Sequence, residues 1–345
     1  MEMDKVAVIG FTASGKTTYA LGMYNKMSLG VGSFSLREKN EDQDYYLSTL
    51  WDNILDGEWP HPSDNKSVYN FTLCHNFHPV IGFDWLDYPG AVVVDPSHEC
   101  REDFRKQLSE ASCLLVLING ESFAYDGSPK KMIRIQATDP QEYKHIVHRN
   151  LERNKDLKAI SALTSLGMDG VVLPPTAIVV TKSDLIEDQW VSYVSEIIKD
   201  NFAPIFGKGS ADERVVMLSA VTLGNNITAG DVDPVDIEHP IAFAVLSILR
   251  RRIQLQRLLR EEAQGKLNEA EAGWLHSIFH GDKITRLKKE IGETDASIQK
   301  MIKDAHFLLD LFPLEKPIYI NDERQDLRSF FANELNRGNF CVSQR

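Results

Sequence analysis

Short runs of consecutive apolar residues alternate along the first two thirds of the chain with longer segments whose apolar residues recur every three or four positions. The short runs are typical of buried strands, and the longer period is typical of amphipathic helices. Strands are expected at residues 6–9, 68–75, 79–86, 113–118, 176–180 and 214–218. Helices are expected over about 16–28, 41–57, 99–111, 140–166 and 187–202. The alternation predicts an α/β fold of the doubly wound type, with a mostly parallel sheet, helices on both faces and one antiparallel edge strand.

Helical periodicity dominates the last third of the chain. A long helix is expected from His239 to about residue 276, with the arginines at 250–252 on a solvated face, and a second helix over 284–312. A hairpin within one chain is the favoured arrangement, and an intermolecular coiled coil in a homodimer is the alternative. A strand at 317–320 and a helix at 326–335 follow. We expect a main domain over 1–258, with insertions near 30–62 and 121–170, and a helical extension and tail over 259–345.

The composition limits the classes of partner. The chain has 345 residues, 43% of them hydrophobic, and a net charge of −12. This acidic balance argues against nucleic acid or an anionic membrane as the main partner, because both require a basic surface. Four cysteines without C-x-x-C spacing favour reduced thiols. No signal-peptide pattern and no apolar run of membrane-spanning length is visible, so we expect a cytoplasmic protein.

The strongest motif is GFTASGKT at residues 10–17, which lies between an apolar strand-like run and a helical pattern. Glycines in such a turn let successive backbone N–H groups converge on a phosphate, and the helix N-terminus adds a positive dipole end. The motif therefore predicts a P-loop that binds a nucleotide triphosphate. Backbone contacts are expected from Ser14, Gly15 and Thr18, a phosphate contact from Lys16, and a Mg²⁺ ligand from Thr17. The alternative is an ordinary turn between a strand and a helix.

A second motif, DYPG at residues 87–90, follows the expected strand at 79–86. An Asp-x-x-Gly tetrad at the carboxyl end of a strand places a carboxylate near Mg²⁺ and a glycine amide near the γ-phosphate. Alone it is also a common turn. Because it follows a P-loop and a strand pair, we expect Asp87 to support the metal and Gly90 to contact the γ-phosphate.

Two more motifs follow strands further along the chain, TKSD at 181–184 and SAV at 219–221. The four motifs in this order resemble the nucleotide-binding motifs of Ras-like P-loop GTPases, and the resemblance covers residues 1 to about 258. It implies that Asp184 accepts hydrogen bonds from guanine N1–H and the 2-amino group, and that the stem of Lys182 lies against the base. It also implies that Ser219 and Ala220 bind the nucleotide, with the Ala220 backbone N–H donating to guanine O6. GTP or GDP with Mg²⁺ is the implied ligand, and an unidentified effector or activating protein is the implied partner.

Three departures from the family pattern bear on affinity and turnover. Thr181 stands where the family usually has an Asn that ties this loop to the P-loop, so weaker nucleotide binding is expected. Ala91 stands where many members have a Gln that orients the attacking water. Thr12 and Ala13 replace small glycines. Hydrolysis is expected to be slow, or to use a residue from elsewhere; the candidates are Asp95, Arg101, Arg105 or a partner protein.

The switch threonine of the family has no obvious counterpart. The stretch WDNILDGEWPHPS at 51–63 resembles the corresponding segment of the bacterial double-GTPase group found in conflict and signalling systems. This likeness puts Ser63 in the place of the residue that caps Mg²⁺ and the γ-phosphate; a turn serine is the alternative. The expected catalytic residues are then Lys16, Ser63 and Gly90, and the expected metal ligands are Thr17, Asp87 and Ser63.

The sequence leaves rival functions open. A nucleotide-binding pseudo-GTPase or scaffold without turnover is suggested by Ala91 and Thr12. A P-loop kinase or ATPase would need an arginine-rich lid, which the sequence does not show. A zinc site is disfavoured because Cys74 and His75 are neighbours on one strand and so point to opposite faces. Its remaining candidate ligands are His78, His98 and Cys100.

Overall fold

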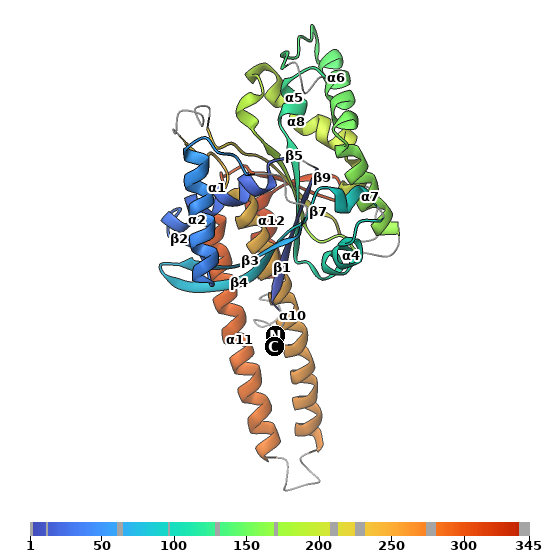
Figure 1. The fold of residues 1–345 in the computed structure, drawn as a ribbon. Helices are drawn as coiled ribbons and strands as arrows, with labels where there is room; N and C mark the ends of the chain where they lie inside the picture. Colours follow the sequence, from blue (N-terminus) through green and yellow to red (C-terminus); the bar gives the residue numbers. More distant parts are fainter. Residues whose placement is uncertain are drawn as a thin grey trace. The chain divides into compact units, whose positions relative to one another are not determined.

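The computed structural model describes residues 3–11, 13–60, 65–95, 97–127, 132–168, 172–207, 213–224, 232–273 and 281–337. The chain forms two compact units. The first comprises Met1–Ala244 and Pro317–Asp326, and the second comprises Val245–Lys316 and Leu327–Arg345. A nine-stranded sheet forms the centre of the first unit, and a pair of long helices forms most of the second (Figure 1).

The strands follow the spatial order β2-β3-β4-β1-β5-β6-β7-β8-β9. Their bounds are β1 (Asp4–Gly10), β2 (Phe34–Glu38), β3 (Ser67–His75), β4 (His78–Asp87), β5 (Cys113–Asn119), β6 (Thr176–Thr181), β7 (Val215–Ala220), β8 (Pro317–Ile320) and β9 (Glu323–Asp326). The five strands from β4 to β7 in this order pair in parallel. Of these, β1, β5, β6 and β7 are near-continuous apolar runs because helices cover both of their faces.

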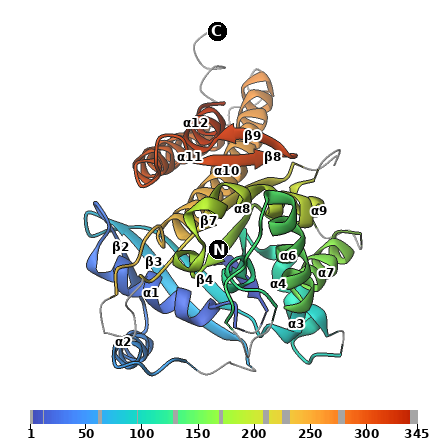
Figure 2. The same cartoon turned by 90° about the horizontal axis from the view of Figure 1, so that it is seen from above.

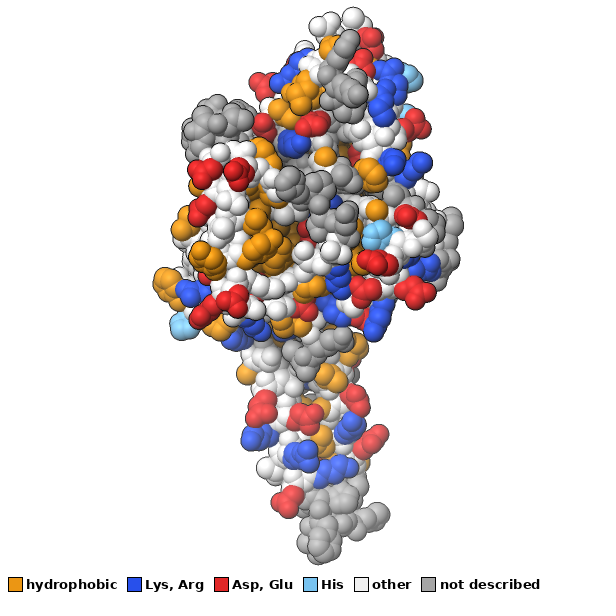
Figure 3. All heavy atoms as spheres, viewed as in Figure 1, with side chains coloured by type: hydrophobic (Ala, Val, Ile, Leu, Met, Phe, Trp, Pro, Cys, Tyr) orange, Lys and Arg blue, Asp and Glu red, His pale blue; other side chains and the backbone are white. Residues whose placement is uncertain are grey.

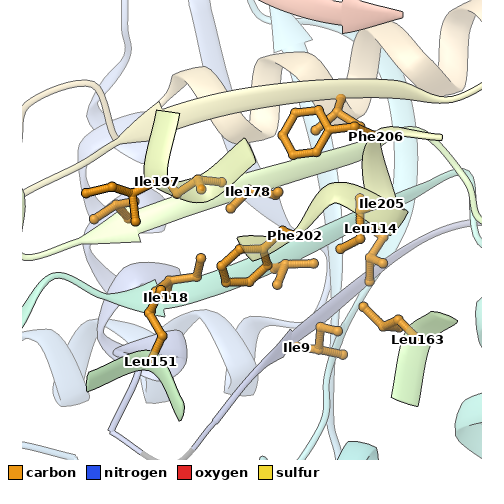
Figure 4. Packing of buried hydrophobic residues seen from close by; sticks show 14 of the residues in the cluster. Ile9, Leu114, Ile118, Leu151, Leu163, Ile178, Ile197, Phe202, Ile205 and Phe206 are labelled. Atoms are coloured by element: carbon orange, nitrogen blue, oxygen red, sulfur yellow. The ribbon is translucent and has the colours of Figure 1, made fainter. Parts of the chain in front are cut away.

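The helices of the first unit lie on both faces of the sheet (Figures 1 and 2). They are α1 (Lys16–Leu29), α2 (Glu41–Leu55), α3 (Ala91–Val94), α4 (Arg101–Glu110), α5 (Glu121–Ala124), α6 (Pro140–Arg153), α7 (Asp156–Met168), a 3₁₀ turn η1 (Ser183–Leu185), α8 (Asp188–Asn201) and α9 (Ala203–Phe206). One face of β1, β5 and β6 packs against α4 and α6–α9 through a single apolar cluster. Figure 4 shows Ile9, Leu114 and Ile178 of the sheet together with Leu163 of α7 and Phe202, which lies between α8 and α9.

The expectation of a mostly parallel sheet with one antiparallel edge strand is wrong. Four of the eight pairings are antiparallel, namely β2–β3, β3–β4, β7–β8 and β8–β9. The expected strand at 317–320 joins this sheet as β8, and β9 pairs with β8 at the edge. Both edges are therefore antiparallel, because hairpins can extend a sheet without the crossover helix that a parallel strand needs.

The helix expected over 140–166 is two helices, α6 and α7. Asn154 ends α6, and Lys155 adopts a left-handed conformation with φ 63°. A left-handed residue interrupts the helical hydrogen bonds and turns the chain. Tyr143 of α6 then stacks on Trp190 of α8 at 4.3 Å between ring centroids, so the first of the two helices covers α8.

The second unit contains most of α10 (His239–Gly273), with α11 (Gly281–Leu309) and α12 (Leu327–Asn336). Ala263 and Leu267 of α10 pack on Leu287 and Ile291 of α11, as the hairpin prediction requires. Arg260 of α10 also pairs with Asp295 of α11, N···O 2.6 Å. Figure 3 shows acidic and basic side chains over the surface of this hairpin.

The solvated position expected for the first of the arginines at 250–252 is wrong. Arg250 forms an ion pair with Glu334 of α12 at 2.7 Å, and the two side chains are only 12% and 5% exposed. Two nitrogens of the guanidinium donate to the same carboxylate oxygen. Because removing one partner of a buried ion pair leaves the other charge uncompensated, this contact fixes α12 on α10.

Asp156, the first residue of α7, generates a prediction about stability. Its side chain is 5% exposed, and one carboxylate oxygen is buried without a partner. Burial raises the pKa of Asp156 from 3.8 to about 7. A raised folded-state pKa means that the folded protein binds the proton more tightly. The contribution of Asp156 to stability is thus present below pH 3.8 and lost as pH rises through about 7.

We expect Asp156→Asn to stabilise the protein increasingly as pH rises across this window, by at most about 4 kcal/mol above neutral pH. Urea unfolding of both proteins at several pH values measures the difference. Asp52→Asn, on the exposed face of α2, is the matched control and should give a flat difference. Equal effects of Asp156→Asn at acidic and alkaline pH would contradict the assignment.

Candidate nucleotide-binding site

The turn between β1 and α1 has the backbone of an anion-binding loop. Ala13 and Gly15 both have positive φ, 67° and 81°. Gly15 is the N-cap of α1, and no side chain caps this helix end. The first amides of a helix have no acceptor within the helix, so those that begin at Lys16 are available to a ligand. A non-glycine residue with positive φ is a strained conformation that is common at functional sites, and Ala13 fits this description.

Lys16, Thr17 and Asp87 form the polar floor of the site. Lys16 Nζ donates to the Gly10 carbonyl at 2.9 Å. Burial lowers the pKa of Lys16, and the charge of Asp87 opposes this effect. Burial raises the pKa of Asp87 to about 6, opposed by the charge of Lys16 and by a hydrogen bond from Thr17. The parallel register places Asp87 opposite Val8 of β1, which explains how residues so far apart in sequence meet.

Asp87 and Thr17 suit a hard divalent cation. One oxygen of the Asp87 carboxylate is buried and has no hydrogen-bond partner. A buried carboxylate oxygen without a donor is costly, and a cation is a natural way to satisfy it. Mg²⁺ prefers one or two protein oxygen ligands together with phosphate oxygens and water. The donor set of Thr17 and Asp87 therefore fits Mg²⁺.

The segment after β4 is anchored to α4 and to the chain before β3. The Tyr88 hydroxyl donates to Asp103 at 2.8 Å. Lys66 pairs with the same carboxylate at 2.7 Å and lies 5.3 Å from the centroid of the Tyr88 ring. Gly90 follows as the N-cap of α3. The Asp-x-x-Gly segment and the chain just beyond Ser63 are thus held by one shared carboxylate.

Thr181, at the end of β6, is hydrogen-bonded to the P-loop. Its buried hydroxyl is 2.9 Å from the carbonyl oxygen of Ser14 and 3.2 Å from that of Ile118. The premise that replacing the family's Asn removes this connection is wrong, since the shorter hydroxyl reaches the same loop. Gly120 is required beside it, because a Cβ there would lie 2.2 Å from the Thr181 carbonyl oxygen.

Lys182 and Asp184 are each positioned by a residue from a neighbouring strand end. Lys182 Nζ donates to Glu121 at 2.6 Å, and its backbone is left-handed with φ 50°. The Thr222 hydroxyl donates to a carboxylate oxygen of Asp184 and accepts from the Gly224 amide at 2.9 Å. The carboxylate is therefore held in one orientation at the rim of the site.

One cavity of about 660 Å³ connects these residues. Of the residues expected from the sequence, those that line it are Gly15, Lys16, Thr17, Thr18, Asp87, Gly90, Lys182 and Asp184. Ser14, Ser219 and Ala220 do not line it. Of the SAV motif only Val221 does, and it is followed along the cavity wall by Thr222–Gly224. Ser63 lies outside the described residues, but Trp59, Pro60 and Asn65 on either side of it line the cavity.

The sequence reasoning missed Glu121 and Thr222. Both stand two residues after the end of a strand, Glu121 after β5 and Thr222 after β7. In a parallel sheet the carboxyl ends of the strands meet at one edge, and ligands bind there. Polar residues just after apolar runs were thus the available signal. Glu121 stands two residues after Asn119, and Thr222 directly follows the SAV motif.

Among the described residues, no cluster of three or more His, Cys, Asp or Glu side chains is arranged to hold a metal ion. Cys74, Cys100 and Cys113 take part in no disulfide within the described part of the chain. Within the same part of the chain, no helix combines the length and the apolar character needed to cross a bilayer.

No protein-family model and no curated protein matches the chain. Solved structures with distant likeness include the signal recognition particle receptor SRb-GTP/SRX complex from Chaetomium thermophilum, 14% identical over 66% of this chain and 93% of that one, TM-score 0.31. The GTP-bound Ski7 GTPase-like domain of S. cerevisiae is 16% identical over 64% and 43%, TM-score 0.33. A GDP-bound NFeoB mutant of S. thermophilus is 14% identical over 90% and 99%, TM-score 0.31. At such scores these likenesses carry no argument, so function is argued from the chain's own residues.

The hydrogen bond between Thr181 and the P-loop generates a prediction. Thr181→Val removes a buried hydroxyl while keeping the side-chain shape, and we expect a loss of about 1–2 kcal/mol in unfolding free energy. Binding of a triphosphate should also weaken, because the P-loop loses its support from β6. Thr176→Val is the matched control. Thr176 lies on the same strand as Thr181, and its buried hydroxyl also donates to a backbone carbonyl, that of Pro174.

Chemical denaturation and calorimetric titration of both variants measure the two effects. Thr176→Val should lower stability with little change in nucleotide affinity. If both variants weakened nucleotide binding equally, the effect would be a general loss of stability and not a loss of P-loop support.

Proposed function

We propose that the protein is a guanine-nucleotide-binding switch that binds Mg²⁺·GTP and hydrolyses it slowly to GDP. The observation that carries the proposal is that Lys16, Thr17 and Asp87 line the same cavity as Lys182 and Asp184. The first group suits a metal-bound triphosphate, and the second suits a purine base. The order of the four motifs in the sequence supports the same assignment.

In this proposal the chain's own groups divide the work along the cavity. Backbone amides around Gly15 and the ammonium of Lys16 bind phosphate oxygens, and Thr17 with Asp87 holds Mg²⁺. The ion, when bound, neutralises charge on the β- and γ-phosphates. The Gly90 amide contacts the γ-phosphate. On this assignment Lys16 exchanges its bond to the Gly10 carbonyl for phosphate oxygens.

Selection of the base is assigned to Lys182 and Asp184. Asp184 accepts two hydrogen bonds from guanine, N1–H and the 2-amino group, whereas adenine offers no such donor pair. Thr222 holds one oxygen of this carboxylate, and Glu121 holds the ammonium of Lys182, which leaves the aliphatic stem of the lysine to lie against the base. These contacts support guanine over adenine, and therefore a GTPase over a kinase or ATPase.

The switch itself is assigned to the two segments that follow β4 and precede β3. They share the Asp103 carboxylate through Tyr88 and Lys66. In this proposal a bound γ-phosphate contacts Gly90 and the segment around Ser63 and so holds the two segments in place. Loss of the γ-phosphate releases them. A partner protein reads this difference, and the C-terminal helices are the natural second surface for it.

The base assignment predicts a change of specificity. Asp184→Asn should lower GTP affinity on the order of a hundredfold, because two hydrogen bonds to a charged acceptor are lost. The same variant should gain affinity for XTP, whose 2-oxo group accepts from the new amide. Thr222→Val is the control: it should weaken GTP binding without creating XTP binding. Calorimetry with GTP, XTP and ATP decides the matter, and unchanged GTP binding by Asp184→Asn would exclude the assignment.

Turnover is a separate prediction. With Ala91 in the place of a water-orienting glutamine, single-turnover hydrolysis of Mg²⁺·GTP should be no faster than about 10⁻⁴ s⁻¹, the order of the intrinsic rate of a GTPase that has the glutamine. Lys16→Ala should abolish it, which excludes a contaminating enzyme. Quantifying bound GTP and GDP over hours measures the rate. GTP that stays bound and intact would instead favour the pseudo-GTPase alternative, in which the nucleotide is a structural element.

A further inference from the structure

The outward face of α10 carries a group of exposed leucines. Leu255, Leu258 and Leu259 are 52%, 62% and 56% exposed. They lie three and four positions apart, so they form one patch on the helix surface. Single exposed leucines are common on protein surfaces, but a contiguous group of them marks an interaction site.

This patch is distinct from the hairpin contact of the same helix. Ala263 and Leu267 face α11 and are 5% exposed, and Ile253 is also buried. At about 100° per residue, Leu255 and Leu258 lie about 60° apart and more than 100° from the mean direction of the buried residues. The helix therefore has two apolar faces, and the fold of one chain covers only one of them among the described residues.

The charges beside the patch are segregated along the helix. Arg251 and Arg252 precede the leucines, and Glu261 and Glu262 follow them. Glu262 is exposed and pairs with Lys266 one turn further on, at 2.6 Å. A parallel pairing of two such helices would oppose like charges, whereas an antiparallel pairing opposes arginines and glutamates.

The antiparallel register can be specified from the sequence. With a twofold axis between residues 256 and 257, Arg251 lies opposite the partner's Glu262, and Arg252 lies opposite the partner's Glu261. The same axis sets Leu255 opposite the partner's Leu258. Residues 251, 255, 258 and 262 follow the four-three-four spacing of a helix–helix seam. The same alignment thus sets leucines opposite leucines and arginines opposite glutamates. The twofold symmetry makes each of these pairings occur twice.

We propose that this face of α10 pairs antiparallel with the same face of a second copy of the chain, forming a homodimer. The inference does not depend on nucleotide binding. A membrane surface is the less suitable occupant, because Glu261 and Glu262 would meet anionic lipid. A different protein would have no reason to match the twofold arrangement of charges.

Sedimentation velocity of the full chain over a concentration series tests the proposal. The unsubstituted protein should show a monomer–dimer equilibrium, and Leu258→Glu should raise the dimer dissociation constant about tenfold or more, since it buries a charge at the seam. Leu314→Glu is the matched control, because Leu314 is 77% exposed and lies outside α10. It should leave the dissociation constant unchanged. A protein that stays monomeric at the highest attainable concentration would overturn the proposal.

A charge exchange tests the register. Glu262→Arg should weaken the dimer because it faces Arg251 across the axis, and adding Arg251→Glu should restore the dissociation constant to within about twofold. The double variant does not restore the bond from Lys266, so recovery excludes an effect within one chain. A dimer indifferent to Leu258→Glu, or a double variant weaker than either single one, would show that another surface or register is used. Circular dichroism of each variant confirms that the helices remain folded.

Discussion

The parallel pairing of β4, β1, β5 and β6 is the constraint on which the site depends. Its register sets Asp87 opposite Val8 of β1 and Thr181 opposite Asn119 of β5. Backbone hydrogen bonds between parallel strands are satisfied only in such a register, and a shift by one residue would turn every side chain to the other face. The P-loop, the Asp87 carboxylate and the turn after β6 therefore all lie at the edge of the sheet where these parallel strands end.

The central strands and the positions of the motifs could be predicted from the sequence, because these strands are apolar runs and the motifs stand at their ends. The sheet edges could not. The residues of β9 are polar and largely exposed, and they join the sheet through backbone pairing with β8, which hydrophobic patterning does not record. The division of α6 from α7 was hidden for a similar reason, since Lys155 carries none of the glycine or proline signals that usually mark a break.

Within the site, individual residue types were predictable, but their connections were not. The hydrogen bond of Thr181 to the P-loop could not be predicted from the sequence, because it depends on how closely two strand ends approach each other. The hydroxyl reaches the Ser14 carbonyl because Gly120 lets the β5 end approach β6 closely. Glu121 and Thr222 escaped notice because their roles consist of orienting Lys182 and Asp184, and an orienting residue has no motif of its own.

The P-loop helix is also tied to the start of α10. The Tyr19 hydroxyl of α1 donates to the Ile237 carbonyl at 3.0 Å, and Lys26 pairs with Glu238 at 2.8 Å. Tyr19 and Ile237 both line the cavity. Helix α10 then continues without interruption to residue 273. Tyr19, Lys26, Ile237, Glu238 and the first residues of α10 all belong to the first unit. The two contacts therefore fix α1 to the residues that precede α10, because a hydrogen bond and an ion pair join the same two segments.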